Sequence, residues 1–177
     1  MEYPESSKAL SVATKRASAL AKEKKFNEAI NVLDNLIREL PNYELDHSSV
    51  AIKIIPYFQK AGRYSEVEKY AENLIVPILK TIQALNKEKA HKIDSLEVAF
   101  SELQCSRVYD KLRLCAKREK HQADEKRFEE QSNNHIKNYH IWLEKGQVER
   151  KRKQRQDLID VFGEDVSNWP TSLRHLY

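Results

Sequence analysis

The sequence is poor in the residues that turn or end secondary structure. It has only three glycines and five prolines in 177 residues, and β-branched residues do not alternate with polar ones for more than a few positions. Strands need frequent turns and such alternation, so this scarcity excludes a β-rich protein. We therefore expect an all-α protein that forms one helical domain over residues 1–177.

Long apolar runs and a strong charge imbalance are also absent. No apolar run approaches the roughly 20 residues of a membrane span, and the opening MEYPESSKAL lacks the regions of a signal peptide. The net charge of +4 is spread along the chain, since residues 1–88 carry 13 basic and 12 acidic side chains and residues 89–177 carry 18 and 15. These features predict a cytoplasmic protein with no membrane partner.

Cysteine is scarce as well. Cys105 and Cys115 lie ten residues apart in one predicted helical stretch, which separates them by about 15 Å along the axis. A disulfide needs Cα atoms within about 7 Å, so these two cannot pair with each other there. We expect two reduced, half-buried thiols, in keeping with an intracellular compartment.

What the sequence does contain is helical periodicity, which is clearest at its start. Residues 8–22 and 26–40 each repeat apolar side chains at helical spacing. Lys24 and Lys25 interrupt the pattern between them, and Pro41 stops it. This part of the chain predicts a helical hairpin with a short turn.

A second hairpin is predicted directly after the first. Asp46 or Ser48 can cap its first helix, and the turn at Gly62 leads into a second helix over residues 64–76. Pro56 falls inside the first of these helices, where it removes a hydrogen bond and predicts a kink. Superposing the start of residues 64–76 on Phe26 gives a period of 38 residues, a length typical of helical repeats.

The first hairpin resembles a tetratricopeptide repeat. The resemblance rests on small residues at the close helix contact, an aromatic residue that opens the second helix, and a terminal proline: Ala17, Leu20, Phe26, Glu28, Ala29, Leu33, Leu36 and Pro41. The second copy is similar but degraded, because Val67 replaces the small residue and Pro77 comes early. The resemblance covers residues 8–79 and implies stacked helical hairpins with a concave groove for a partner.

The resemblance also implies which residues line that groove. The inward positions are Ser11, Thr14, Ser18 and Lys22 in the first repeat and Ser49, Ile52, Gln59 and Lys60 in the second. Thr14 and Ser18 stand where co-chaperone repeats carry a lysine-and-asparagine clamp, so recognition of a chaperone tail is not expected. The groove is polar and mildly basic, which suits an acidic loop or helix of a specific protein.

Residues 80–163 are predicted to form long capping helices. Two hairpins leave an apolar face that only a neighbour can cover, so the C-terminal half must supply that cover. Residues 78–118 contain no glycine or proline and carry an apolar stripe; one very long helix and two helices broken near residues 86–92 both fit it.

The rest of the chain is predicted to be helical up to Gly163. Residues 117–134 are strongly charged and predict a solvated helix, and residues 136–148 predict another, amphipathic helix. Gly163 ends a last apolar turn. We expect the tail, residues 164–177, to pack against the body through its two aromatic residues, Trp169 and Tyr177.

A basic run near the C-terminus is the strongest charge feature. Residues 150–155 have five basic side chains among six and can touch nucleic-acid phosphate or an acidic protein surface. Acidic neighbours dilute its field, and no aromatic residues are interleaved for base stacking. A solvated helix face is the third reading. The residues proposed for this patch are Arg150, Lys151, Lys153 and Arg155.

Motifs that carry chemistry are not found in the sequence. It has no glycine-rich phosphate loop and no nucleophile elbow, and we expect no metal and no cofactor. The sequence therefore predicts a non-catalytic protein–protein interaction module, such as an adaptor, a secretion chaperone or a toxin-neutralising immunity protein. The alternatives are a nucleic-acid-associated protein that uses the basic run and an unrecognised helical enzyme.

Overall fold

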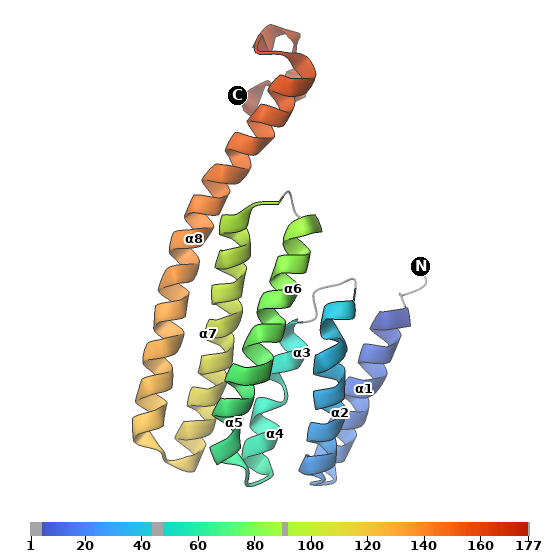
Figure 1. The fold of residues 1–177 in the computed structure, drawn as a ribbon, viewed down its shortest axis with the longest axis vertical. Helices are drawn as coiled ribbons and strands as arrows, with labels where there is room; N and C mark the ends of the chain where they lie inside the picture. The colour runs from blue at the N-terminus through green and yellow to red at the C-terminus, as the bar shows by residue number, and fades with distance from the viewer. Residues whose placement is uncertain (1–4, 44–47, 90–91, 177) are drawn as a thin grey trace.

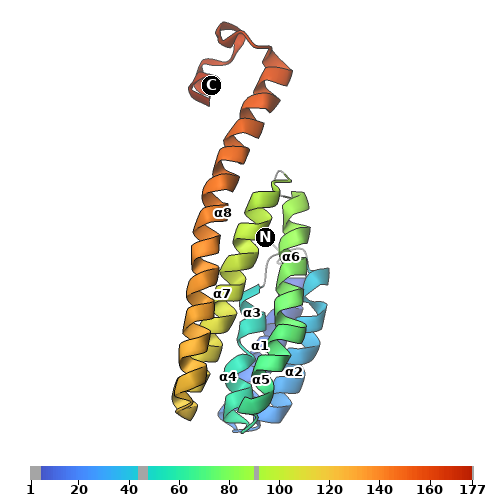
Figure 2. The ribbon, with the colours of Figure 1, turned by 60° about the vertical axis from the view of Figure 1, so that its left-hand side comes forward.

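The helices stand side by side in chain order and run alternately up and down (Figure 1). The computed structural model describes residues 5–43, 48–89 and 92–176, and no strand occurs within these ranges. The predicted all-α class is confirmed. Both views show the last helix rising well beyond the ends of the others (Figures 1 and 2).

The first two helices form the first predicted hairpin. Helix α1 (Glu5–Lys22) packs against α2 (Phe26–Glu39), and the chain reverses through Lys24, whose φ of 64° is left-handed. Ala17 and Ala29 are 1% and 0% exposed. Because both side chains are small and fully buried, the backbones of the two helices can approach closely.

The next predicted helix is divided in two around a proline. Helix α3 (Ser48–Ile52) ends before α4 (Ile55–Lys60), which carries Pro56 in its first turn. The ring of a proline clashes with the carbonyl four residues earlier and its nitrogen donates no hydrogen bond, so the predicted kink becomes a break. Gly62, with a φ of 74°, then turns the chain as expected. The alternative cap at Asp46 lies outside the described residues.

The helix after this turn is longer than predicted. Helix α5 (Tyr64–Tyr70) continues through the π-helical segment Ala71–Ile75 into α6 (Val76–Lys89), so Pro77 does not close the hairpin. The wider π turn ends at Ile75, and α6 begins at the next residue, with Pro77 as its second residue. Such local widening is one way for a continuing helix to accommodate a proline.

Two long helices complete the array. Helix α7 (Asp94–Glu119) meets α8 (Gln122–Phe162) at Lys120, whose φ is 61°. Residues 78–118 therefore belong to two helices, which was one of the two predicted alternatives. The prediction of separate helices over residues 117–134 and 136–148 was wrong, because α8 is a single helix of 41 residues.

Helix α7 covers the second hairpin, as the capping role of the C-terminal half requires. One buried apolar cluster runs from α1 to α7 and reaches α8 at Phe128. Four residues of α7 belong to it: Val108, Leu112, Cys115 and Ala116. Both cysteines are free and are fully rather than half buried, and burial raises the pKa of each thiol.

Small residues bring α7 and α8 close together. The hydroxyls of Ser106 and Ser132 lie 3.0 Å apart in the buried contact, and Ser132 Oγ donates to the Ser106 carbonyl over 3.1 Å. Gly146 of α8 lies against Leu96 of α7. A Cβ atom at Gly146 would stand 2.5 Å from Leu96 Cδ2 and 3.0 Å from the Leu96 nitrogen, so the helices need a glycine there.

The C-terminal tail folds back beside the end of α8 (Figure 1). Gly163 ends the helix with a φ of 79°, and two short 3₁₀ helices follow, Val166–Asn168 and Thr171–Leu176. Trp169 is 1% exposed, and its indole N–H donates to the Gly163 carbonyl over 2.9 Å. Trp169 is buried as predicted, but the tail packs on the far end of α8 and not on the body of the helical array; Tyr177 lies outside the described residues. None of the helices in the described ranges has the length and apolar character needed to cross a membrane.

The contact between α1 and α2 gives a first prediction. Ala29→Leu adds three carbons to a fully buried position, so it should lower the free energy of unfolding by about 1–3 kcal/mol. Asn35→Leu on the exposed side of α2 is the matched control and should change it by less than about 0.5 kcal/mol. Urea unfolding followed by circular dichroism measures both. Equal stability of the Ala29→Leu variant and the wild type would contradict the close helix contact.

The contact between α7 and α8 gives a second prediction. Gly146→Val forces Leu96 and the α7 backbone to move, so overpacking should cost about 1–3 kcal/mol of unfolding free energy. Valine has a higher helix propensity than glycine by only a few tenths of a kcal/mol, so this gain offsets little of the overpacking cost. The exposed neighbour Gln147→Val is the control. A Gly146→Val protein as stable as its control would show that the two helices are further apart.

Candidate functional site

The groove residues predicted from the repeat resemblance lie in different surroundings. Lys22, Ser49 and Lys60 are exposed, and Thr14 and Ser18 are half-buried. Ile52 is 6% exposed and belongs to the core, so its assignment as a partner contact was wrong. The assignment assumed one continuous helix, and the break after α3 changes which side chains of this segment face inward.

The predicted groove positions of the second hairpin face neighbouring helices. Gln59 Nε2 donates to Glu119 Oε1 of α7 over 2.9 Å, and the other amide atom, Gln59 Oε1, is buried. The Lys60 ammonium lies 5.9 Å from the centre of the Phe26 ring of α2. Of these two residues, Lys60 alone is exposed to solvent and so open to a partner.

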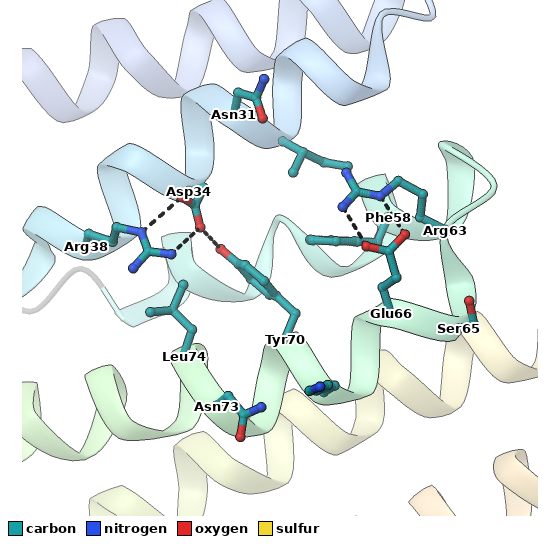
Figure 3. A pocket seen from close by; sticks show the side chains of 12 residues that line it. Asn31, Asp34, Arg38, Phe58, Arg63, Ser65, Glu66, Tyr70, Asn73 and Leu74 are labelled. Atoms are coloured by element: carbon teal, nitrogen blue, oxygen red, sulfur yellow. Dashed lines mark hydrogen bonds and ion pairs between the residues drawn. The ribbon is translucent and has the colours of Figure 1, made fainter.

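A cleft of about 680 Å³ lies between α2 and α5, on residues that the sequence did not single out (Figure 3). Its apolar part comes from Ile30, Phe58 and Leu74, and polar groups stand around them. Figure 3 shows two separate clusters of charged side chains, one at each end of the view. None of the predicted groove residues is among those that line this cleft.

The first cluster joins α2 to α5 through the hydroxyl of a half-buried tyrosine, Tyr70. Arg38 of α2 binds Asp34 with Nε and Nη2, over 3.0 and 3.3 Å, and the Tyr70 hydroxyl donates to the same carboxylate over 2.6 Å. Partial burial favours the protonated carboxyl, but the bonds from Arg38 and Tyr70 outweigh it and hold the pKa of Asp34 below its usual range. Burial, then the bond to Asp34, raises the pKa of Tyr70.

The second cluster centres on Arg63 at the start of α5. Its guanidinium donates to both Glu66 oxygens, over 2.9 and 2.7 Å, and to Asn27 Oδ1 of α2 over 3.3 Å. The same group lies 4.9 Å from the centre of the Phe58 ring. The bond from Arg63 lowers the pKa of Glu66. Both clusters thus fasten the second hairpin to the first.

Because of these pairings, the ionisable groups of the two clusters are poorly suited to act as a general acid or base at neutral pH. Its carboxylates, Asp34 and Glu66, are held ionised by arginines, and the Tyr70 hydroxyl is held protonated. A general acid or base needs a pKa near the working pH, which these groups do not have. Within the described ranges, no three His, Cys, Asp or Glu side chains are placed to hold a metal ion.

The basic run lies on the part of α8 that rises past the other helices (Figure 2). Helix α7 starts at Asp94, and near that start Ser95 Oγ donates to Glu149 Oε1 over 2.9 Å. Residues 150–155 follow directly, and every one of them is exposed. The four predicted patch residues, Arg150, Lys151, Lys153 and Arg155, are therefore together at the surface.

Comparisons with protein families, with curated proteins and with solved structures find no match to this chain.

The Tyr70–Asp34 bond gives a pH-dependent prediction. Tyr70→Phe removes the donor to a half-buried carboxylate, so we expect a loss of about 0.5–1.5 kcal/mol of unfolding free energy at pH 7. Because the pKa of Asp34 is lower in the folded state, this contribution is complete above the unfolded value of about 4 and is lost as the pH falls through the folded value.

Urea unfolding of the wild type and of Tyr70→Phe at several pH values between neutral and strongly acidic checks this dependence. The stability difference should be constant from neutral pH down to about 5 and should shrink below about 4. The asparagine introduced by Asp34→Asn is uncharged at every pH. The stability difference between Asp34→Asn and the double variant Asp34→Asn/Tyr70→Phe should therefore not change with pH. If the stability difference between the wild type and Tyr70→Phe stayed constant down to strongly acidic pH, it would contradict the bond between Tyr70 and Asp34.

Proposed function

We propose that this chain is a non-catalytic protein–protein interaction module that binds a specific acidic protein through the basic end of α8. One observation carries the proposal: five basic side chains in six residues are all exposed on a helix end beside which no other long helix runs. Such a surface attracts acidic partners and speeds their association. Its members are Arg150, Lys151, Arg152, Lys153 and Arg155.

The charge pattern around this surface favours a protein over a nucleic acid. The six residues span only about 9 Å of helix. Glu149 precedes them directly, and Asp157 and Asp160 follow within the next five residues. Phosphate backbones are long, continuous lines of charge, and tight binding to them needs many cations in series. A short basic surface with acidic borders instead suits a protein that carries a matching cluster of carboxylates.

The hairpins serve, in this proposal, as a tetratricopeptide-like scaffold. The buried Ala17 and Ala29, the turn at Gly62 and the cross-hairpin bonds between residues 36 apart support a repeat. The paired charges of the cleft support a structural rather than a catalytic role for it. An adaptor, a secretion chaperone and a toxin-neutralising protein all have this kind of binding function, and Lys22 and Lys60 remain the exposed charges of the groove proposed from the resemblance.

Affinity purification from the source cells, read by quantitative mass spectrometry, tests the proposal. A variant with Arg150, Lys151, Lys153 and Arg155 all changed to glutamate should lose an acidic protein that the wild type retains, by about tenfold or more. All four side chains are exposed, so the fold should survive, and circular dichroism checks this. The variant Lys22→Glu/Lys60→Glu should retain the same protein.

Two results would contradict this assignment. If the groove variant lost the partner and the α8 variant kept it, the binding surface would be the groove. If nuclease treatment removed the co-purifying material, and binding to duplex RNA or DNA fell steeply with salt, the nucleic-acid alternative would hold.

A further inference from the structure

Helix α8 lies at the edge of the helical array and packs along one side only. Its buried residues, Phe128, Ser132 and Gly146, all face α7. Its main helical neighbour is α7, and Figure 1 shows no other helix of the described residues on the opposite side of α8 along the length that lies beside α7. The side chains on that outer side determine what α8 can bind along its length.

Six exposed residues form a straight line on this outer side. They follow one another at steps of four, four, three, four and three residues, a mean of 3.6, so they share one face of a straight helix. The line is about 27 Å long. We call it the outer stripe; its members are Lys137, Ile141, Lys145, Val148, Arg152 and Arg155.

The outer stripe combines two apolar with four basic side chains, and the exposed Glu144 borders it one turn from both Ile141 and Val148. Ile141 and Val148 are 64% and 63% exposed. They lie seven residues apart, which is the spacing at which one helix packs against another. The Lys145 ammonium lies 4.7 Å from the centre of the Trp142 ring, and both side chains border the start of α7, so Lys145 forms the edge of the stripe nearest α7.

We propose that the outer stripe docks an acidic amphipathic helix of another protein. Apolar side chains of the partner pack on Ile141 and Val148, and its glutamates or aspartates pair with the basic residues of the stripe. The proposal rests on the proposed function and specifies it, because it extends the contact from the basic end of α8 down to Lys137 and assigns a secondary structure to the partner.

Charge complementarity selects this occupant over the others. A second copy of the chain presents the same basic stripe, so like charges would meet. A membrane-surface helix has a broad apolar face, usually with tryptophan, phenylalanine or leucine, whereas the stripe offers only Ile141 and Val148 among four basic side chains. Phosphates of a nucleic acid can pair with the basic residues but leave Ile141 and Val148 in water.

Fluorescence anisotropy with a synthetic helical peptide tests the proposal. The peptide has about 18 residues, the length that matches about 27 Å, with leucine at every seventh position and glutamate flanking each leucine. A scrambled peptide of the same composition keeps the charge and loses the amphipathic face. The full chain should bind the ordered peptide about tenfold or more tighter than the scrambled one.

Matched variants on α8 locate the contact. Val148→Asp should weaken binding of the ordered peptide by about tenfold or more, whereas Val161→Asp should not change it. Val161 is 71% exposed and lies about 140° around the helix from Val148. Arg152→Glu should weaken binding in the same way, whereas Lys126→Glu, at an exposed position of α8 eleven residues before the stripe begins, should leave it within about twofold.

Each other outcome overturns the inference. Equal affinity for both peptides, with equal effects of Lys126→Glu and Arg152→Glu, would mean that charge alone attracts acidic chains; the proposed function would survive. Binding of anionic phosphatidylserine vesicles or duplex RNA that is lost in Val148→Asp would assign the stripe to that class of partner. A wild-type dimer in size-exclusion chromatography that Val148→Asp dissociates would assign it to a second copy. If neither peptide bound, the stripe would have no such role, and the affinity purification would decide the proposed function separately.

Discussion

Burial of α7 between the second hairpin and α8 is the interaction on which the rest of the structure depends. The hairpins alone leave an apolar face, and Val108, Leu112 and Cys115 of α7 enter the same buried cluster as the residues of that face. The other side of α7 packs closely on α8, because Ser106 of α7 meets Ser132 of α8 and Leu96 of α7 lies against Gly146 of α8. Because both contacts use one helix, loss of α7 would expose the second hairpin and leave α8 without its main neighbour.

The same arrangement explains why α8 offers a surface. The contact between α7 and α8 ends near the hydrogen bond between Ser95 and Glu149. Beyond Glu149, α8 continues for more than three turns. Apolar residues disappear from residues 150–157, where no helix would bury them, and return at Leu158 and Ile159, near which the tail with the buried Trp169 folds back. Basic side chains occupy the uncovered turns, and they keep that length of helix hydrated and available to an acidic partner.

Much of the fold could be predicted from local chemistry. The helix pattern, the break at Pro56 and the turn at Gly62 follow from rules that act within a few residues, and the structure has them. The continuation of the helix past Pro77 could not be predicted, because the π turn before it has no sequence signature. The inward face of α3 was misjudged at Ile52. The break after α3 changes the direction of this short helix relative to α4, so positions counted along one continuous helix face other neighbours. The cleft clusters were missed because some of their partners, such as Asp34 and Tyr70, are far apart in sequence. The local signals were the i,i+4 pair of Asp34 and Arg38 and the i,i+3 pair of Arg63 and Glu66.

Hydrogen–deuterium exchange read by mass spectrometry tests most directly the central claim that α8 is held mainly by α7 and is open at its basic end. A helix segment without packing partners opens locally at low cost, whereas a packed one exchanges only with larger unfolding. Peptides from residues 150–157 should therefore exchange many times faster than peptides from residues 128–146 of the same helix and from the buried part of α7. Equal, strong protection along the whole of α8 in the monomer would contradict the claim, because it would require a second element to cover the basic end.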